Sequence, residues 1–128
     1  MKAYAVKDWN DKYEIAQSRK LKYMHWVAIP NQYKGNGYMT LSELPKAVEI
    51  FAAFILIVEV ASTMKTRGLL VSDGGLPLTP KHLSKITYYP EHIFKMAFEE
   101  LVKPEIGWLE IVKIGRAVGD STTVVGDS

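Results

Sequence analysis

Residues 78–112, LTPKHLSKITYYPEHIFKMAFEELVKPEIGWLEIV, contain the pattern that decides the fold. Thr79 stands directly before Pro80, the arrangement of an N-cap followed by a proline at the first helical position, where the missing N–H costs nothing. A second proline, Pro90, is followed by Glu91, whose carboxylate suits the positive end of a helix dipole. The segment therefore predicts two helices, each starting at one of these prolines.

The first helix is expected over residues 80–86 and the second over residues 90–103, with residues 87–89 as the turn between them. A turn of three or four residues sets two helices at a steep angle. On the second helix, apolar residues recur at spacings of three and four, so they share one face that packs against a core. These residues are Ile93, Phe94, Ala97, Phe98 and Leu101. Pro104 ends the helix and residues 106–112 are rich in strand-forming residues, so the order of elements is that of a winged helix-turn-helix.

The longest expected helix covers residues 45–64, and its apolar residues surround most of its circumference, which is typical of a helix in the middle of its domain. These residues are Ala47, Ile50, Phe51, Phe54, Ile57, Val58 and Ala61. After this helix, Asp73, Gly74 and Gly75 form a hairpin signal. We expect this hairpin and a strand around Trp108 to make a small antiparallel sheet. The predicted fold class is therefore α+β and helix-dominated, a winged helix-turn-helix with a small antiparallel sheet.

The remaining segments carry weaker signals. Residues 11–19 are compatible with a short helix, and residues 23–29, YMHWVAI, are rich in aromatic and β-branched residues and predict a strand. Residues 33–37, YKGNG, predict a turn. From residue 115 the chain is small, polar and aperiodic, as in a flexible tail or linker. We expect one domain over residues 1–114, with residues 115–128 leading to a missing C-terminal region.

Composition excludes several classes of protein. A chain of 128 residues is long enough to bury a core without a metal or a disulfide, and it contains no cysteine. Its formal net charge of +2 is far from the basic excess of proteins that coat nucleic acids, so any such contact must come from a local patch. The amino terminus lacks the order of a signal peptide, and the apolar run at residues 50–58 is too short for a bilayer span of about twenty residues. We expect a cytoplasmic protein with no membrane partner.

Catalytic and metal-binding motifs are missing from the sequence. The three histidines, His25, His82 and His92, fall on different predicted elements, and their spacing matches no metal site. The sequence has no nucleophile elbow, Walker loop or dinucleotide fingerprint. We therefore predict that the protein is not an enzyme, with no catalytic residues, no metal and no cofactor.

Binding to double-stranded DNA is the first function that the helix pair suggests. The leading residues of a recognition helix reach base edges in the major groove, while the helix before it crosses the phosphates. On this interpretation Lys81 and Lys85 contact phosphates, and His92 and Lys95 reach deeper into the groove. The candidate DNA-binding residues of the pair are Lys81, His82, Lys85, Tyr88, Tyr89, His92 and Lys95.

A second basic cluster lies earlier in the chain. Arg19, Lys20 and Lys22 form either an additional DNA-binding arm on phosphate or a solvated face. Arg67 either joins one of the basic patches as a DNA contact or hydrogen-bonds carbonyl groups at the end of the long helix.

A protein-interaction module is the alternative function. The second helix carries Glu91, Glu99 and Glu100, which outnumber its lysines and disfavour contact with phosphate. In this alternative the wing, the hairpin and the amino-terminal segment build a homo-oligomer.

Several segments carry a family resemblance. They are Ser18-Arg19-Lys20, Trp26-Val27-Ala28-Ile29-Pro30-Asn31, Ala61-Ser62, Arg67-Gly68-Leu69-Leu70, the helix-turn-helix and Ile106-Gly107-Trp108-Leu109. In this order they resemble the amino-terminal domain of phage and prophage replication-initiation proteins, which is similar in layout to the winged-helix amino-terminal domain of DnaD-type primosomal proteins. The resemblance covers residues 9–113 and depends on the order of elements.

The resemblance implies a role at a replication origin, for a domain that binds DNA, oligomerises, or does both. In that family a flexible linker often joins this domain to a second domain that contacts the helicase loader. Residues 115–128 match such a linker, and no segment matches the carboxy-terminal DnaD-like domain.

Overall fold

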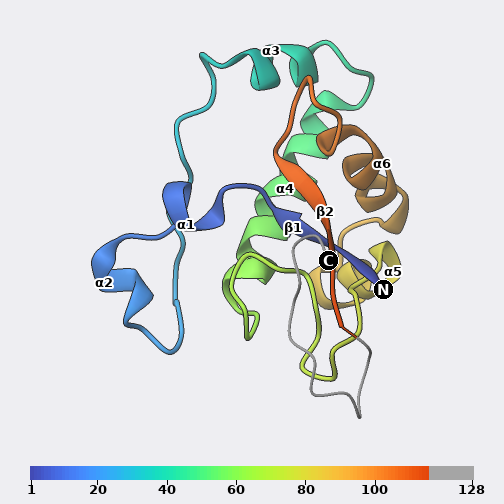
Figure 1. Cartoon of the computed structure of the whole chain (residues 1–128). Coiled ribbons are helices and arrows are strands. Elements are labelled where there is room, and N and C mark those ends of the chain that lie inside the picture. The colour runs from blue at the N-terminus through green and yellow to red at the C-terminus, as the bar shows by residue number, and fades with distance from the viewer. Residues whose placement is uncertain (116–128) are drawn as a thin grey trace.

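Helix α4 (Ala47–Ser62) lies at the centre of the structure, with the other elements arranged around it (Figure 1). The computed structural model describes residues 1–115, so the expected tail, apart from Gly115, lies outside the described residues. The fold is α+β and helix-dominated with a small antiparallel sheet, which confirms the coarse prediction. Along the chain the elements are β1 (Lys2–Val6), α1 (Trp9–Lys12), α2 (Ala16–Arg19), α3 (Asn36–Ser42), α4, α5 (Pro80–Thr87), α6 (Glu91–Leu101) and β2 (Leu109–Lys113).

The apolar circumference of α4 explains its central position. On this helix only Val48 and Glu59 are exposed. The helix is expected over residues 45–64 and is observed two residues shorter at each end. At its start, Lys46 takes a left-handed conformation with φ 64° and serves as the N-cap. Its buried residues are Ile50, Ala53, Phe54, Ile57, Val58, Ala61 and Ser62.

Helices α5 and α6 form the expected helix pair, joined by residues 88–90. The helix α6 begins at Glu91 and ends at Leu101, two residues before the predicted end. Its buried residues are the five that the spacing predicted to face the core: Ile93, Phe94, Ala97, Phe98 and Leu101. The periodicity of this segment was therefore sufficient to identify its packed face.

The sheet pairs β1 with β2 in antiparallel register, from Lys2 opposite Lys113 to Val6 opposite Leu109. This pairing corrects the prediction that the hairpin near Asp73 would supply the partner strand. The two strands lie at opposite ends of the described chain, and they bury Ala3, Ala5 and Val6 of β1 and Leu109 of β2.

The predicted hairpin forms as a turn but adds little to the sheet. The backbone N–H of Ser72 donates to the carbonyl oxygen of Leu76 at 2.8 Å, and Gly75 adopts a positive φ of 84°. Beyond the turn, the stem makes two isolated bridges among the described residues, one between Val71 and Pro77 and one between Leu69 and Ala5 of β1. Proline has no backbone N–H to donate, so the stem does not extend into a ladder.

The strand predicted at residues 23–29 is wrong. Residues 20–34 contain no strand and run along one side of the molecule from α2 to α3 (Figure 1). Strand propensity reflects packing against neighbouring strands, and no strand among the described residues lies beside this segment. We call residues 20–35 the arm.

The segments flanking the arm also differ from the prediction. The helix expected over residues 11–19 is split into α1 and α2, because Tyr13 and Glu14 between them turn into the interior. Helix α3 starts inside the expected turn, at Asn36. A Cβ on Gly37 would meet the carbonyl oxygen of Ile106 at 2.8 Å, so a glycine is needed for this helix to approach the chain before β2.

Candidate nucleic-acid interface

An exposed stripe on α5 carries the strongest candidate contacts. Lys81 and Lys85 are four residues apart, so they lie on the same face of the helix, and the exposed C-cap residue Tyr88 follows them. The opposite face is held in the core by Leu83, which is fully buried. Within residues 1–115, neither Lys81 nor Lys85 forms an ion pair. Both ammonium groups are therefore accessible to a phosphate.

Thr79 is the N-cap of α5, as the sequence predicted, and the structure shows that the cap is reciprocal. The backbone N–H of His82 donates to the Thr79 Oγ1 at 3.2 Å. In return, the backbone N–H of Thr79 donates to the Nδ1 of His82 at 3.3 Å. His82, predicted to contact DNA, thus uses one ring nitrogen within the helix cap.

The two tyrosines of the turn have different environments. Tyr88 adopts a left-handed conformation with φ 60°, and 94% of its surface is exposed. Tyr89 instead packs edge-on against Phe94 and donates its hydroxyl to the carbonyl oxygen of Glu49 at 2.9 Å. Burial, followed by the negative charge of Glu49, raises the pKa of Tyr89. Tyr89 therefore connects the turn to α4, and we leave it out of the DNA-contacting set.

Helix α6 exposes His92 and Lys95 near its amino-terminal end. The ammonium group of Lys95 lies 3.6 Å from a carboxylate oxygen of Glu91, one turn earlier on the same helix. The other two glutamates, Glu99 and Glu100, lie at the far end of α6, and Glu100 pairs with Lys103 at 3.0 Å. Two of the three acidic residues of α6 thus lie away from the turn, and the third, Glu91, is paired with Lys95.

The second basic cluster lies apart from the helix pair. Arg19 belongs to α2, and Lys20 and Lys22 follow it, on the side of the molecule opposite α5 (Figure 1). Arg19 also donates to the backbone carbonyl oxygen of Asn10. The structure therefore does not unite this cluster with Lys81 and its neighbours in one basic face.

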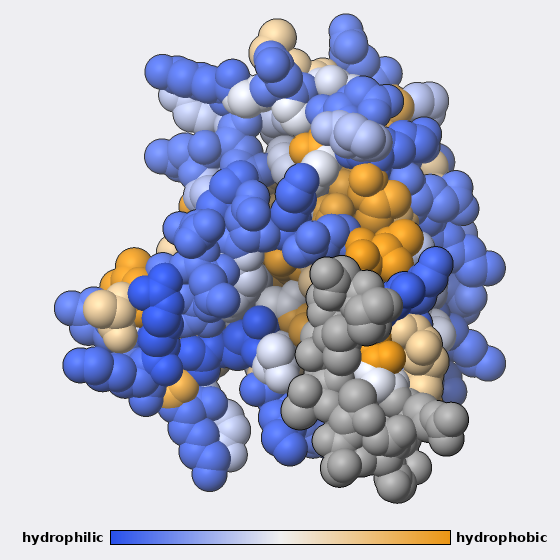
Figure 2. Space-filling view, viewed as in Figure 1, coloured by the Kyte–Doolittle hydropathy of each residue, from blue (hydrophilic) through white to orange (hydrophobic). Residues whose placement is uncertain are grey.

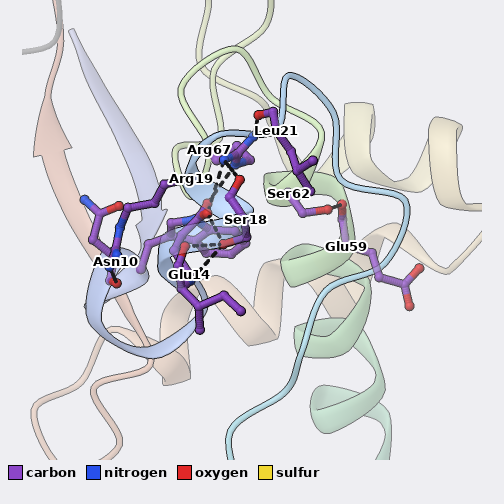
Figure 3. A network of polar contacts seen from close by, with 10 residues as sticks. Asn10, Glu14, Ser18, Arg19, Leu21, Glu59, Ser62 and Arg67 are labelled. Atoms are coloured by element: carbon purple, nitrogen blue, oxygen red, sulfur yellow. Dashed lines mark hydrogen bonds and ion pairs between the residues drawn. The ribbon is translucent and has the colours of Figure 1, made fainter.

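Arg67 lies in an internal polar network (Figure 3). Its Nε and one terminal nitrogen donate to the carboxylate of Glu14 at 2.7 and 3.1 Å. Its terminal nitrogens also donate to the carbonyl oxygens of Ser18 and Leu21, both at 2.8 Å. With its guanidinium occupied in this way, Arg67 is a structural residue, and we leave it out of the DNA-contacting set.

Glu14 is a residue that the sequence analysis missed. It is buried, and it also accepts hydrogen bonds from the indole N–H of Trp9 at 2.6 Å and the hydroxyl of Ser18 at 2.7 Å. Burial alone would raise its pKa, but the hydrogen bonds from Arg67, Trp9 and Ser18 and the charge of Arg67 lower it to about 2. The 53-residue separation of Glu14 from Arg67 has no sequence signature that would have revealed the pair.

No group of three or more histidine, cysteine, aspartate or glutamate side chains in residues 1–115 is placed to hold a metal ion. No helix in that part of the chain combines the length and the apolar character needed to cross a bilayer. A scan against protein-family models finds no match to this chain, and searches of curated proteins and of solved structures find none either.

Proposed function

We propose that the protein binds double-stranded DNA through α5 and α6, in the manner of a winged helix-turn-helix. The observation that carries this proposal is the exposed stripe of Lys81, Lys85 and Tyr88, in which both lysines lack an ion pair within the described residues. In such motifs the first helix crosses the phosphate backbone and the second enters the major groove with its leading residues. The exposed lysines of α5 support its placement on the DNA backbone, and the exposed His92 and Lys95 at the start of α6 support its placement in the groove.

The distribution of charge answers the objection that α6 is acidic. A recognition helix enters the groove with its amino-terminal end, where His92 and Lys95 lie. Glu99 and Glu100 lie at the other end, and Glu91 is neutralised locally by Lys95. The part of the pair nearest the turn is therefore positive, which suits a phosphate backbone.

The sequence resembles replication-initiation proteins of phages and prophages, and this resemblance suggests the process in which the DNA binding takes part. We propose a role at a replication origin, with a region beyond residue 115 contacting a helicase loader or another replisome protein. The order of α4, α5, α6 and β2 supports the winged helix-turn-helix interpretation, with β2 in the position of the wing.

The salt dependence of duplex binding tests the proposal. If Lys81 and Lys85 displace counterions while Lys95 stays paired with Glu91, the slope of log affinity against log salt should be about −2. Replacing Lys81 and Lys85 by Ala should reduce the magnitude of that slope by about 2 and weaken binding on every duplex alike. Fluorescence anisotropy of a labelled duplex at several salt concentrations gives both values.

The matched control is the double variant Lys7→Ala, Lys65→Ala, which removes the same charge from outside the helix pair. It should leave both the slope and the affinity nearly unchanged. Equal effects of the two double variants would show that net charge alone attracts the DNA, and absence of binding at low salt would refute the proposal.

A homo-oligomer through β2 is a second candidate function, supported by a specific observation. Among the described residues β2 pairs only with β1, and no described strand lies along its other edge. Ile111, in the middle of β2, is half exposed, and Figure 2 shows apolar side chains at the surface in the region of β1 and β2. A strand at the edge of a sheet, with apolar side chains beside it, can pair with a strand from a second copy.

Sedimentation analysis tests this second function directly. If copies pair along β2, the wild-type chain should sediment as a dimer, and Ile111→Lys should shift it to a monomer while the circular dichroism spectrum stays the same. A wild-type chain that is monomeric at the highest accessible concentration would eliminate the β2 interface.

A further inference from the structure

The arm has a one-sided charge. The sequence contains no aspartate or glutamate between Glu14 and Glu43, while Lys20, Lys22 and Lys34 lie in this interval on the arm. The three lysines are exposed, and within residues 1–115 none of them forms an ion pair. This stretch of the surface is therefore complementary to a polyanion.

Three aromatic side chains lie in the sequence between Lys22 and Lys34 and are largely exposed. Tyr23, Trp26 and Tyr33 expose 67%, 79% and 63% of their surface. Large aromatic residues usually bury most of their area, so three exposed rings in one segment need an explanation. The other two tryptophans, Trp9 and Trp108, are 6% and 8% exposed.

Two of the lysines lie close to two of the rings. The ammonium group of Lys22 lies 5.6 Å from the ring centroid of Tyr23, and that of Lys34 lies 5.6 Å from the ring centroid of Tyr33. Each such pair places an aromatic face beside a positive charge. A nucleotide has the matching pair of features, a flat base and a phosphate.

The arm is attached to the domain at several points. Arg67 donates a hydrogen bond to the carbonyl oxygen of Leu21 at 2.8 Å, and Met24 and Val27 pack against the main core. At its other end, the Nε2 of Gln32 donates to the hydroxyl of Tyr13 at 3.4 Å. The arm is thus anchored to the domain, and the positions of its exposed rings are fixed relative to one another.

A cavity of about 340 Å³ lies where the arm meets α3 and α4. Its lining includes Gln32, Tyr33, Tyr38 and Phe51. The Oε1 of Gln32 is buried and has no hydrogen-bond partner among the described residues. Aromatic walls beside an unused acceptor suit the ring and the N–H groups of an unstacked base.

We propose that the arm binds single-stranded nucleic acid, with its lysines on phosphates, Tyr23 and Trp26 stacking on bases, and one base near Gln32. Exposed rings beside cations are the features by which proteins hold single strands without reading their sequence. A duplex hides its base faces, so this site selects unpaired strands. The inference goes beyond the proposed duplex binding and does not depend on it, because α5 and the arm lie on different sides of the molecule.

Tryptophan fluorescence gives a direct readout, because Trp26 is the exposed tryptophan while Trp9 and Trp108 are buried. Adding an oligothymidylate of about 16 nucleotides should quench the emission of Trp26, and Trp26→Ala should abolish that change. In an anisotropy assay with the same labelled oligonucleotide, Trp26→Ala should weaken binding by about tenfold or more. Trp26→Phe keeps a stacking ring and should retain most of the affinity.

Further variants separate the contributions of charge and of the cavity. Lys20→Ala with Lys22→Ala should reduce the magnitude of the salt slope for the single strand by about 1.4. Gln32→Met keeps the length of the side chain but removes the amide, and it should weaken binding as well. Val48→Ala, at an exposed aliphatic residue of α4, is the control that should change nothing.

The outcomes distinguish this proposal from the proposed duplex binding. Trp26→Ala should leave duplex affinity unchanged, and the substitutions of Lys81 and Lys85 should leave the quenching of Trp26 unchanged. An oligouridylate that binds as well as the oligothymidylate supports the same site for both sugars. Failure of the single strand to bind at low salt, or binding that Trp26→Ala does not weaken, overturns the proposal. A dimer that dissociates in Trp26→Ala and shields Trp26 from iodide overturns it as well, by assigning the arm to a protein partner.

Discussion

At the scale of single residues, burial separates the roles of Arg67 and Lys81, two cations that the sequence analysis named as candidate DNA contacts. The side chain of Arg67 is 15% exposed and is paired with Glu14, whose side chain is 2% exposed. A charge removed from water needs a partner at close range, and each of these two groups provides one for the other. Lys81 keeps its hydration and no ion pair in the described part of the chain, so it remains available for a phosphate.

The lowered pKa of Glu14 predicts how stability depends on pH. Since its pKa falls from 4.5 to about 2 in the folded protein, its contribution is present above about pH 4.5 and is lost as the pH falls toward 2. That contribution is on the order of 3 kcal/mol. Urea unfolding of wild type and Glu14→Gln should therefore show a difference in free energy that is constant near neutral pH and shrinks toward pH 2.

Glu99→Gln is the control for this experiment, because Glu99 is exposed on α6. The free energy of unfolding of Glu99→Gln should differ little from that of wild type at every pH. A difference between wild type and Glu14→Gln that stays the same down to pH 2 would contradict the ion-pair interpretation of Glu14.

At the scale of elements, α5 depends on its cap and its buried side. It has eight residues, fewer than the roughly 12 to 15 that an isolated helix needs to be stable in water. Thr79 satisfies an N–H group at the start of α5, and Leu83 attaches the helix to the core. The lysine stripe of the proposed interface is therefore positioned by residues that do not belong to it.

Removing the cap should weaken α5 without altering its charge. Thr79→Ala should lower the free energy of unfolding by about 1 kcal/mol, because the backbone N–H of His82 loses its acceptor. The midpoint of urea denaturation measures the change. Thr66→Ala, at an exposed threonine outside any helix, should have little effect, and equal losses in the two variants would argue against the cap.

At the scale of the whole molecule, Trp108 connects the chain before β2 to the central helix. Its ring lies 4.8 Å from that of Phe54 and 6.1 Å from that of Phe51, centroid to centroid, and both phenylalanines belong to α4. Trp108 and Phe94 are buried in the same core. The contacts of Trp108 are with α4, however, whereas Phe94 packs against the ring of Tyr89.

Trp108→Ala should destabilise the protein by about 3 to 5 kcal/mol, because it leaves a cavity between the sheet and α4. Trp26→Ala is the matched control: the same substitution at a ring that is 79% exposed should change the thermal midpoint little. A shift of only about a degree or two for Trp108→Ala would mean that this ring does not hold the fold together.

Local signals in the sequence determined the helix pair, its cap and the buried face of α6. Thr79, the two prolines and the spacing of residues 93–101 act over one or two turns of helix, so they can be read without knowing the rest of the fold. The same holds for the all-round apolar character of α4, which predicted its central place. The lysine stripe followed from these, since helical spacing alone puts Lys81 and Lys85 on one face.

Only the tertiary structure decided the partner of β2, the role of Arg67 and the course of the arm. Strand pairing depends on which apolar faces meet, and β1 and β2 lie at opposite ends of the described chain, so no local pattern joins them. Glu14 and Arg67 are likewise brought together by packing. Residues 23–29 have the composition of a strand but no neighbour to pair with, and for that reason their rings stay in solvent.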